Sequence, residues 1–408
     1  MIAPIYPDRA CTVFLIFLRL GLTAFGGPIA HLGYFHTEFV VRRKWISAQG
    51  YADLVSLCQF LPGPASSQVG IALGFYRAGY RGALAAWIGF TLPSALILIL
   101  FAISLTTYVE IIPVGVLDGL KIVAVAVIVQ AVWGMARSLC TDVTRITIMA
   151  ISTCFLLLVP SIWSQFIIIL IAAILGRWLF QPHLDHINEH LAVPISKRIG
   201  VSCLMIFLGL LLILPVAHAF FPNQFLAIID AFYRTGALVF GGGHVVLPLL
   251  QAEVVSTGWI ENERFLAGYS ITQAMPGPLF TFAAFLGASL EGFSSPWIVG
   301  TVCLMAIFLP SFLLVIGTLP FWEDMRRNIK LRAALYAVNA AVVGILLAAL
   351  YQPIWTETIR KPQDFCLALI ALIALQFWKL PIWLVIILGG LIGGLLNSAI
   401  LAERSFLF

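Results

Sequence analysis

Charged residues are scarce in this sequence. Lysine and arginine together number 23 and aspartate and glutamate 18, which makes 10% of 408 residues, whereas 61% are hydrophobic. Soluble globular domains carry about 25% charged residues, and a long chain with so few charges cannot cover itself with a polar surface. The composition therefore excludes a large soluble protein and indicates an all-α protein that crosses a membrane several times.

A dense basic stripe is also missing. The formal net charge is +5, and the basic clusters are "RRK" (42–44) and "MRRNIKLR" (325–332). A nucleic-acid-binding face would need a denser basic stripe. We therefore interpret these clusters as charges of cytoplasmic loops.

Cysteine gives no sign of a disulfide framework or a metal site. None of the seven cysteines stands in a C-x-x-C arrangement, and most lie in apolar runs. Cysteines in such runs usually act as small, buried apolar side chains. Three histidines, His183, His186 and His190, have the spacing of one helix face; we interpret their segment as a solvated loop.

Motifs of nucleotide binding and enzyme catalysis are absent as well. The sequence contains no G-x-x-x-x-G-K-[ST], no H-E-x-x-H and no G-x-S-x-G. No pair of acids stands at helical spacing within an apolar run. We therefore predict neither an enzyme nor an ATP-driven pump, and no cofactor.

Long apolar runs dominate what is present, and a full crossing needs about 20 residues. The N-terminal run faintly resembles a signal peptide, but Arg19 interrupts it and no clear cleavage site follows, so we expect a retained first membrane segment. Two segments, 50–77 and 262–292, are apolar but interrupted by Pro-Gly-Pro. The uninterrupted runs are 11–27, 83–107, 111–136, 146–160, 161–180, 199–221, 225–243, 297–320, 333–353, 364–378 and 381–400.

The two halves of the chain match each other. "FLRLGLTAFGGP" (17–28) pairs with "FYRTGALVFGGG" (232–243), "QFLPGP" with "QAMPGP", and "LPSALIL" (92–98) with "LPSFLLV" (309–315). Glu38 pairs with Glu253 and Trp45 with Trp259 in the same order. This pattern indicates an internal duplication. We expect one repeat domain at 1–180 and a second at 225–408. A polar linker and an unmatched membrane helix, together 181–224, lie between them.

Charges in equivalent loops predict that the repeats are inverted. "VVRRKW" follows the first glycine run, whereas "QAEVVSTGWIENE" follows the second. "TYVEIIPVGVLD" follows the first LPS helix, whereas "FWEDMRRNIKLR" follows the second. Because cationic loops stay in the cytoplasm, equivalent loops belong on opposite sides of the membrane.

The Pro-Gly-Pro breaks predict a transport site. Proline interrupts helical hydrogen bonding, and freed backbone groups are tolerated in a membrane only where protein buries them or a watery cavity solvates them. Paired breaks in two repeats are typical of the discontinuous helices at a transporter's centre, and the helix after a break directs its N-terminal amides at anions. A simple kink is the alternative.

Polar residues near the breaks and glycine runs complete the predicted site. Arg19 and Arg234 occupy matching positions and favour an anionic substrate, although an interfacial anchor would explain each of them too. Lys121, in another run, has Asn339 as its repeat partner. The predicted substrate-binding residues are Arg19, Gly26, Gly27, Gln59, Pro62, Gly63, Pro64, Ser66, Arg234, Gly241, Gly242, His244, Gln273, Pro276, Gly277, Pro278 and Thr281.

These motifs and their order resemble the chromate transporter (CHR) family in its long, two-domain form. The resemblance covers nearly the whole chain and implies export of chromate, chromate resistance, a multi-pass location in the inner membrane and oppositely oriented halves. It supports the glycines, prolines and glutamines of the motifs as functional positions. The repeats differ after the break, "ASSQVG" against "LFTFAA", so one half could dominate binding.

We therefore predict a secondary transporter of chromate or another oxyanion that works by alternating access between the two broken helices. The sequence leaves three alternatives open: a transporter of sulfate, a transporter of another oxyanion, and a passive anion channel. It also leaves open the coupling ion, the direction of transport and whether the protein forms a homo-oligomer.

Overall fold

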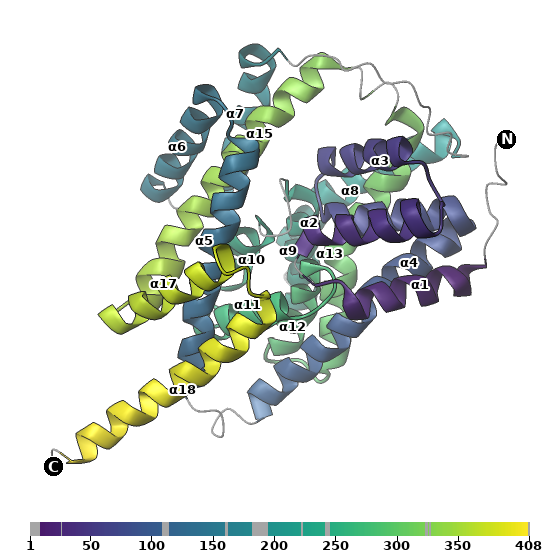
Figure 1. Cartoon of the computed structure of the whole chain (residues 1–408). Helices are drawn as coiled ribbons and strands as arrows, with labels where there is room; N and C mark the ends of the chain where they lie inside the picture. Colours follow the sequence, from purple (N-terminus) through teal and green to yellow (C-terminus); the bar gives the residue numbers. More distant parts are fainter. Residues whose placement is uncertain are drawn as a thin grey trace.

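A computed structural model describes residues 9–25, 27–107, 114–159, 162–181, 195–221, 223–240, 245–322, 325 and 328–406. All regular elements among them are helical (Figure 1). The first half contains α1 (Ala10–Thr23), α2 (Gly27–Phe35), η1 (His36–Arg42), α3 (Ala48–Phe60), α4 (Ala65–Thr107), α5 (Val114–Leu139), α6 (Val143–Leu158) and α7 (Ile162–Leu179).

The second half follows a separate helix, α8 (Lys197–Phe220). The linker histidines lie outside the described residues. The elements of the second half are α9 (Gln224–Leu238), α10 (Val246–Val254), α11 (Asn262–Ala274), η3 (Leu279–Thr281), α12 (Phe282–Ser289), α13 (Pro296–Thr318), η4 (Leu319–Phe321), α15 (Ile329–Ala349), η5 (Leu350–Trp355), α16 (Thr356–Thr358), α17 (Pro362–Gln376) and α18 (Ile382–Phe406).

Helix α4 is a hairpin of two arms rather than one long span. Ala78 and Gly79 leave helical geometry, and Gly79 has φ +61°. The two arms pack closely: a Cβ on Gly74 would collide with the backbone of Gly82, and a Cβ on Gly82 would collide with the backbone of Gly74. Helix α3 precedes α4, and Ser47 caps it by accepting a hydrogen bond from the Gly50 amide. The order along the chain is therefore α3, a break, the short first arm of α4, a turn and the long second arm of α4.

The second half repeats this order. Helix α11 ends at Ala274, residues 275–278 break the chain, and η3 with α12 forms a short arm before α13. Pro296 starts α13 at its first turn, where the missing amide of proline does no harm. The breaks predicted within 50–77 and 262–292 therefore lie between α3 and α4 and between α11 and η3.

The same helix crossing also occurs twice. A Cβ on Gly21 of α1 would meet the Phe90 carbonyl oxygen of α4 at 2.7 Å, and a Cβ on Gly236 of α9 would collide with the Ile307 carbonyl oxygen of α13. Glycine permits this close approach because it has no side chain. The equivalent glycines thus place the first helix of each half against the long arm after the break.

Both halves contribute to the same core. One buried cluster joins Phe17 and Leu57 of the first half to Tyr233 and Val315 of the second. A larger cluster joins first-half residues such as Leu98 to the aromatic side chains of α12. The halves are therefore interlocked around the breaks, and the labels of α2, α9, α11, α12 and α13 gather near the middle of Figure 1.

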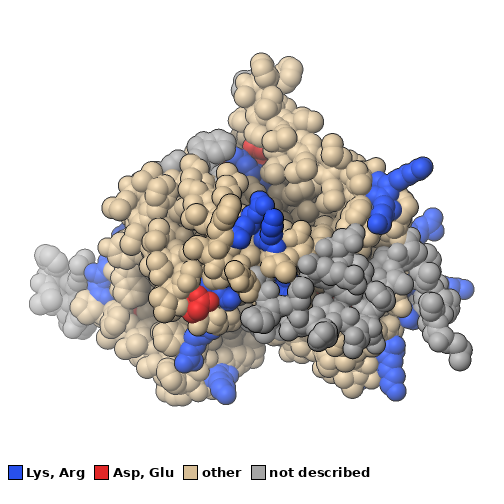
Figure 2. All heavy atoms as spheres, turned by 90° about the horizontal axis from the view of Figure 1, so that it is seen from above, with Lys and Arg blue, Asp and Glu red and all other residues tan. Residues whose placement is uncertain are grey.

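The lengths and surfaces of the helices fit a multi-pass membrane protein. Among the described residues, five helical stretches are long and apolar enough to cross a membrane, one of them the hairpin α4, and further apolar helices of 10–17 residues accompany them. Only 11% of the most apolar window of α8 is buried inside the protein, so this helix presents leucine and isoleucine side chains outward. Figure 2 shows a face on which charged side chains are few and scattered.

Candidate functional site

Each Pro-Gly-Pro break contacts the segment that follows the first helix of the other half. The amide of Gly63 donates to the carbonyl oxygen of Val239 at 2.6 Å, and the amide of Gly277 donates to the carbonyl oxygen of Ala24 at 3.0 Å. Ala24 and Val239 are extended residues that end α1 and α9. The two contacts use equivalent residues of the two repeats, and they exchange partners between the halves.

The LPS motifs support the same two crossings. A Cβ on Gly63 would meet Ser311 Oγ at 2.7 Å, and a Cβ on Gly277 would meet Ser94 Oγ at 2.8 Å. Each break glycine therefore lies against the LPS serine of the opposite half. Both glycines also have positive φ, +118° and +103°, where a side chain strains the backbone. Local conformation and tertiary packing both require glycine here.

The first turn of α4 lines the first break with buried polar groups. Ser66, Ser67 and Gln68 are 2%, 3% and 0% exposed. Gln68 Nε2 donates to the Pro62 carbonyl oxygen at 2.6 Å. Gln68 Oε1, Ser67 Oγ and Ser311 Oγ are buried and make no hydrogen bond in the part of the chain that the structure describes.

A histidine joins this polar group to the first glycine run. His31 of α2 is 1% exposed; its Nε2 donates to the Ala24 carbonyl oxygen at 3.1 Å, and its Nδ1 lies 3.5 Å from Ser66 Oγ. Ala24 thus receives hydrogen bonds from His31 and from the Gly277 amide. This arrangement connects the first glycine run with both breaks.

The second break has less polar surroundings. Phe280 and Phe282 are buried at the positions that Ser66 and Gln68 occupy at the first break. Thr281 matches Ser67, and its hydroxyl donates to the Pro278 carbonyl oxygen at 2.7 Å. The motif glutamines also differ, because Gln273 is buried whereas Gln59 is exposed. The first break therefore has the more polar surroundings of the two, and the unsatisfied Ser67 Oγ, Gln68 Oε1 and Ser311 Oγ lie there.

The two predicted arginines have different environments. Arg19 lies on the exposed side of α1. Arg234 is largely buried, and its Nη2 lies 3.1 Å from Asp230 Oδ2 and 3.0 Å from Glu253 Oε2. The role of either arginine as an anion ligand stays a prediction.

Glu38, the repeat partner of Glu253, has other partners. Arg43 Nε donates to it at 2.7 Å and Arg42 Nη1 at 3.1 Å. Burial raises the pKa of the Glu38 carboxyl, but the hydrogen bonds and charges of Arg43 and Arg42 outweigh this effect and hold the pKa below its ordinary value.

The remaining predicted residues take the following places. Pro62 and Pro64 flank Gly63, and Pro276 and Pro278 flank Gly277, all in non-helical backbone. Gly27 begins α2 with φ +77°. Four predicted residues, Gly26, Gly241, Gly242 and His244, lie outside the described residues.

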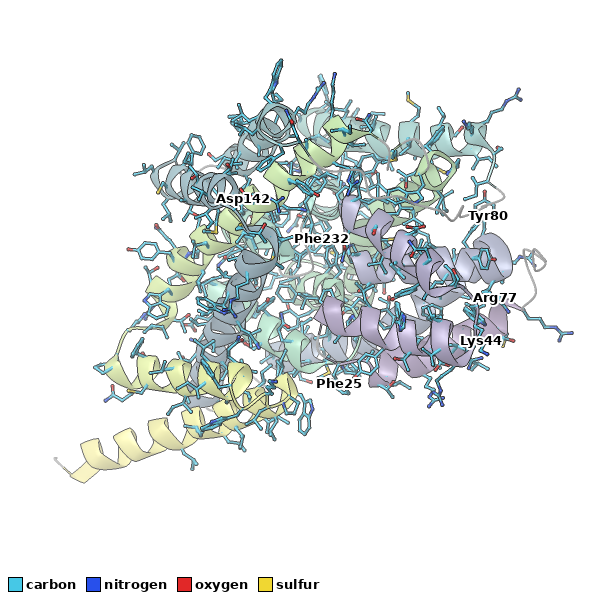
Figure 3. The ribbon with its side chains drawn as sticks, turned by 45° about the horizontal axis from the view of Figure 1, so that its top comes forward. Phe25, Lys44, Arg77, Tyr80, Asp142 and Phe232 are labelled. Atoms are coloured by element: carbon cyan, nitrogen blue, oxygen red, sulfur yellow. The ribbon has the colours of Figure 1, made fainter. Side chains whose placement is uncertain are left out.

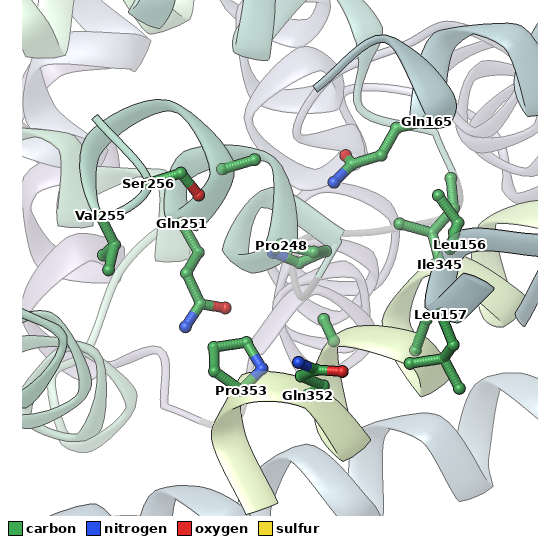
Figure 4. A pocket seen from close by; sticks show the side chains of 13 residues that line it. Leu156, Leu157, Gln165, Pro248, Gln251, Val255, Ser256, Ile345, Gln352 and Pro353 are labelled. Atoms are coloured by element: carbon green, nitrogen blue, oxygen red, sulfur yellow. The ribbon is translucent and has the colours of Figure 1, made fainter. Parts of the chain in front are cut away.

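A separate cavity of about 390 Å³ lies between α6, α7, α10, α15 and η5 (Figure 4). Gln165, Gln251 and Gln352 line it together with Ser256 and apolar side chains, and Gln165 Oε1 is buried without a described hydrogen-bond partner. None of the predicted site residues lines this cavity.

The profile of the chromate transporter family matches residues 11–177 and 226–394, one segment in each half. The chain belongs to the chromate transporter family. It is therefore a multi-pass membrane transporter and not an enzyme, as the composition and motifs predict. The two matched segments fit the two repeats.

Curated relatives of this chromate transporter family member match most of its length. A probable chromate transport protein from Synechococcus elongatus is 29% identical over 96% of both chains. A chromate transport protein from Pseudomonas aeruginosa is 29% identical over 94% of this chain and 91% of its own. An uncharacterized transporter from Methanocaldococcus jannaschii is 27% identical over 83% of each. No solved structure matches the chain.

Several residues at these crossings were not predicted as site residues: His31, Ser94, Ser311, Asp230 and Glu253. The two serines lie in the repeated LPS motif, and Glu253 matches Glu38 in the duplication. Alignment of the halves is therefore a signal that could find these three. His31 and Asp230 have no counterpart of their type in the other repeat, since Val246 and Leu15 stand there.

Proposed function

We propose that this protein transports chromate or a similar tetrahedral oxyanion by alternating access, at a site between the two breaks. The reciprocal hydrogen bonds from Gly63 to Val239 and from Gly277 to Ala24 carry this proposal. They join both repeats at one place, where irregular backbone inside a membrane protein is expected to line a substrate site. The names of the relatives support chromate as the substrate.

The first turn of α4 is the part of this site best suited to an oxyanion. Its N-terminal end follows Pro64, and backbone amides at a helix start attract negative charge. Ser67 Oγ and Ser311 Oγ are buried hydroxyls without described partners, and each hydroxyl can donate one hydrogen bond. An oxyanion bound there would satisfy groups that are otherwise costly to bury.

Inverted repeats supply the mechanism of the proposal. The basic loop after the first glycine run carries Lys44, and Arg77 at the end of the first arm of α4 lies 4.8 Å from the ring centre of Trp45. Figure 3 shows Lys44, Arg77 and Tyr80 together at one end of the first half. The equivalent loop of the second half is acidic, which supports opposite orientations.

The membrane potential can drive this transport. The potential is worth about 2.3 kcal/mol per charge per 100 mV, so an inside-negative potential favours the export of a dianion. Sulfate shares the shape and charge of chromate, and competition between the two would separate those substrates. A passive channel would differ from a transporter when the membrane potential is clamped at zero, because only a transporter then couples outward movement of unlabelled substrate to inward movement of labelled substrate.

The test replaces the unsatisfied hydroxyls. We expect Ser67→Ala and Ser311→Ala each to weaken chromate counterflow in proteoliposomes by about tenfold, since a hydrogen bond to a charged group contributes about 1.5–3 kcal/mol. Their thermal stability should stay equal or rise, because a buried unsatisfied hydroxyl is removed. Ser289→Ala is the matched control, since Ser289 is equally buried but donates to the Phe285 carbonyl oxygen.

Normal counterflow in both serine variants would contradict the proposed site. Equal losses in Ser67→Ala and Ser289→Ala would also contradict it, because the effect would then belong to packing and not to the substrate.

A further inference from the structure

An arginine–glutamate pair occurs at equivalent positions in both repeats, but the ion pair forms in only one of them. Arg234 and Glu253 are in contact, Nη2 to Oε2 at 3.0 Å, and both side chains are largely buried. Their equivalents are Arg19 and Glu38, each 215 positions earlier, from 234 minus 19 and 253 minus 38. Arg19 makes no ion pair with any residue that the structure describes, and Glu38 binds Arg42 and Arg43 instead.

The formed pair connects α9 to α10, the helices on either side of the second glycine run. Asp230, one turn earlier on α9, also contacts Arg234 Nη2 at 3.1 Å and holds the guanidinium in place. Val239, five residues after Arg234, accepts the hydrogen bond from Gly63 at the first break. The Arg234–Glu253 contact therefore fixes the helix pair against which the first break is docked.

The elements that carry the unformed pair are in contact. Phe17 and Phe39 stack with ring centres 5.1 Å apart, and these residues are neighbours of Arg19 and Glu38 along their helices. The same element pair in the second half brings Arg234 and Glu253 together. Arg19 stands two positions after the buried Phe17, on the exposed side of α1, so α1 must turn relative to η1 for Arg19 to reach Glu38.

Glu38 has alternative partners that its equivalent lacks. The loop that follows Glu253 in the second repeat, "VVSTGW" (254–259), contains no arginine or lysine, so no cation of that loop competes for Glu253. Arg42 is 59% exposed and Arg43 37% exposed at the side chain, and exposed ion pairs are weak. Exchange of Glu38 from these arginines to Arg19 would replace one set of ion pairs with another, so the buried carboxylate would keep a cationic partner.

We propose that the two arginine–glutamate pairs are alternating clamps of the transport cycle. In the conformation described, Arg234–Glu253 is closed and Arg19–Glu38 is open; in the opposite conformation the repeats exchange roles. This proposal rests on the proposed function, because inverted repeats that swap conformations produce alternating access. It predicts a state in which Glu38 leaves Arg42 and Arg43 and binds Arg19, while Arg234 leaves Glu253.

Cross-linking tests the exchange in the full-length protein after its native cysteines have been replaced and chromate counterflow has been shown to persist. One variant carries Arg19→Cys with Glu38→Cys, and a second carries Arg234→Cys with Glu253→Cys. Each is treated with a short bifunctional thiol reagent. A third variant carries all four substitutions. We expect the 19–38 pair and the 234–253 pair each to form a cross-link, and we expect each cross-link to abolish counterflow. In the third variant, a molecule that forms one cross-link should not form the other.

Freeing Glu38 from its exposed partners should shift the balance. Arg42→Gln together with Arg43→Gln removes the competing partners. We expect spin labels at the exposed positions 225 of α9 and 256 after α10, which keep the Arg234–Glu253 pair, to separate in about two- to fivefold more molecules. The control is the pair Lys121→Cys with Glu263→Cys, whose ion pair at 3.3 Å has no repeat equivalent. Its cross-linking should not respond.

Three results would overturn the proposal: cross-linking of 234–253 without any of 19–38, formation of both cross-links in one molecule, or an unchanged spin-label distance after loss of Arg42 and Arg43. These results are independent of the substrate. Absence of chromate counterflow in the unmodified protein would instead reject the proposed function, while mutually exclusive cross-links would still establish the clamps.

Discussion

Replacement of the break glycines tests the crossing of the repeats most sharply. In Gly63→Ala the new methyl group would lie 2.7 Å from both Gln68 Nε2 and Ser311 Oγ, at a backbone φ of +118°. Strain of this kind costs about 1–3 kcal/mol, and overpacking adds about 1–3 kcal/mol. The crossing is therefore weakened by roughly 2–6 kcal/mol, and even the lower figure predicts a loss of transport of about 30-fold.

Gly277→Ala should behave in the same way. Its methyl group would lie 2.8 Å from Ser94 Oγ and 3.2 Å from the Phe90 carbonyl oxygen, at φ +103°. Counterflow of radiolabelled chromate in proteoliposomes measures both variants, with the amount of inserted protein determined in the same vesicles.

Two glycines provide matched controls. Gly258 has φ +75° but no neighbouring atom within 4 Å of an added Cβ, so Gly258→Ala introduces strain without crowding. Gly33, inside α2, has neither positive φ nor a close neighbour. We expect normal transport in Gly33→Ala and a small loss of stability in Gly258→Ala. Full transport in both Gly63→Ala and Gly277→Ala would show that transport does not depend on the close crossings at these glycines.

Further predictions concern helix contacts and pH. Lys121→Met removes the ion pair that joins α5 to Glu263 at the start of α11, and it should lower stability in detergent by about 1 kcal/mol because the acidic partner is exposed. An unchanged melting temperature would show that this pair contributes nothing. Gly119→Leu should separate α5 from α18, since a Cβ there would collide with the Gly389 backbone; cross-linking between these helices reports the loss. Glu38 lies outside the candidate membrane spans, and its pKa in the folded protein is below the ordinary value of 4.5. Ionised Glu38 therefore stabilises the protein above pH 4.5, and this stabilisation is lost as the pH falls through the lower pKa of the folded state. The melting temperature of Glu38→Gln should therefore fall less at acidic pH than that of the unsubstituted protein. The same dependence of melting temperature on pH in both proteins would contradict a lowered pKa of Glu38.

The breaks and the duplication were accessible from sequence because their signals are local or repeated. Proline and glycine limit the backbone wherever they stand, so the Pro-Gly-Pro segments mark interrupted helices without knowledge of their surroundings. The turn inside α4 at Gly79 likewise falls between two of the predicted apolar segments. Such features depend on residue type and spacing alone.

The partners at the site were not accessible in this way. The hydrogen bond from Gly63 to Val239 joins residues far apart in the chain, and an extended valine carries no signal of that role. Arg19 and Arg234 occupy equivalent positions, yet only Arg234 is bound by two carboxylates. Their difference arises from Asp230, which is Leu15 in the first repeat, and from packing that periodicity does not describe.

The most direct measurement of the central claim is uptake of radiolabelled chromate into everted membrane vesicles with and without this protein, with sulfate as competitor. We predict protein-dependent, saturable accumulation that an inside-positive potential increases and that excess sulfate does not abolish completely. No accumulation in vesicles shown to contain the inserted protein would contradict chromate transport, and complete suppression by sulfate would identify sulfate as the preferred substrate.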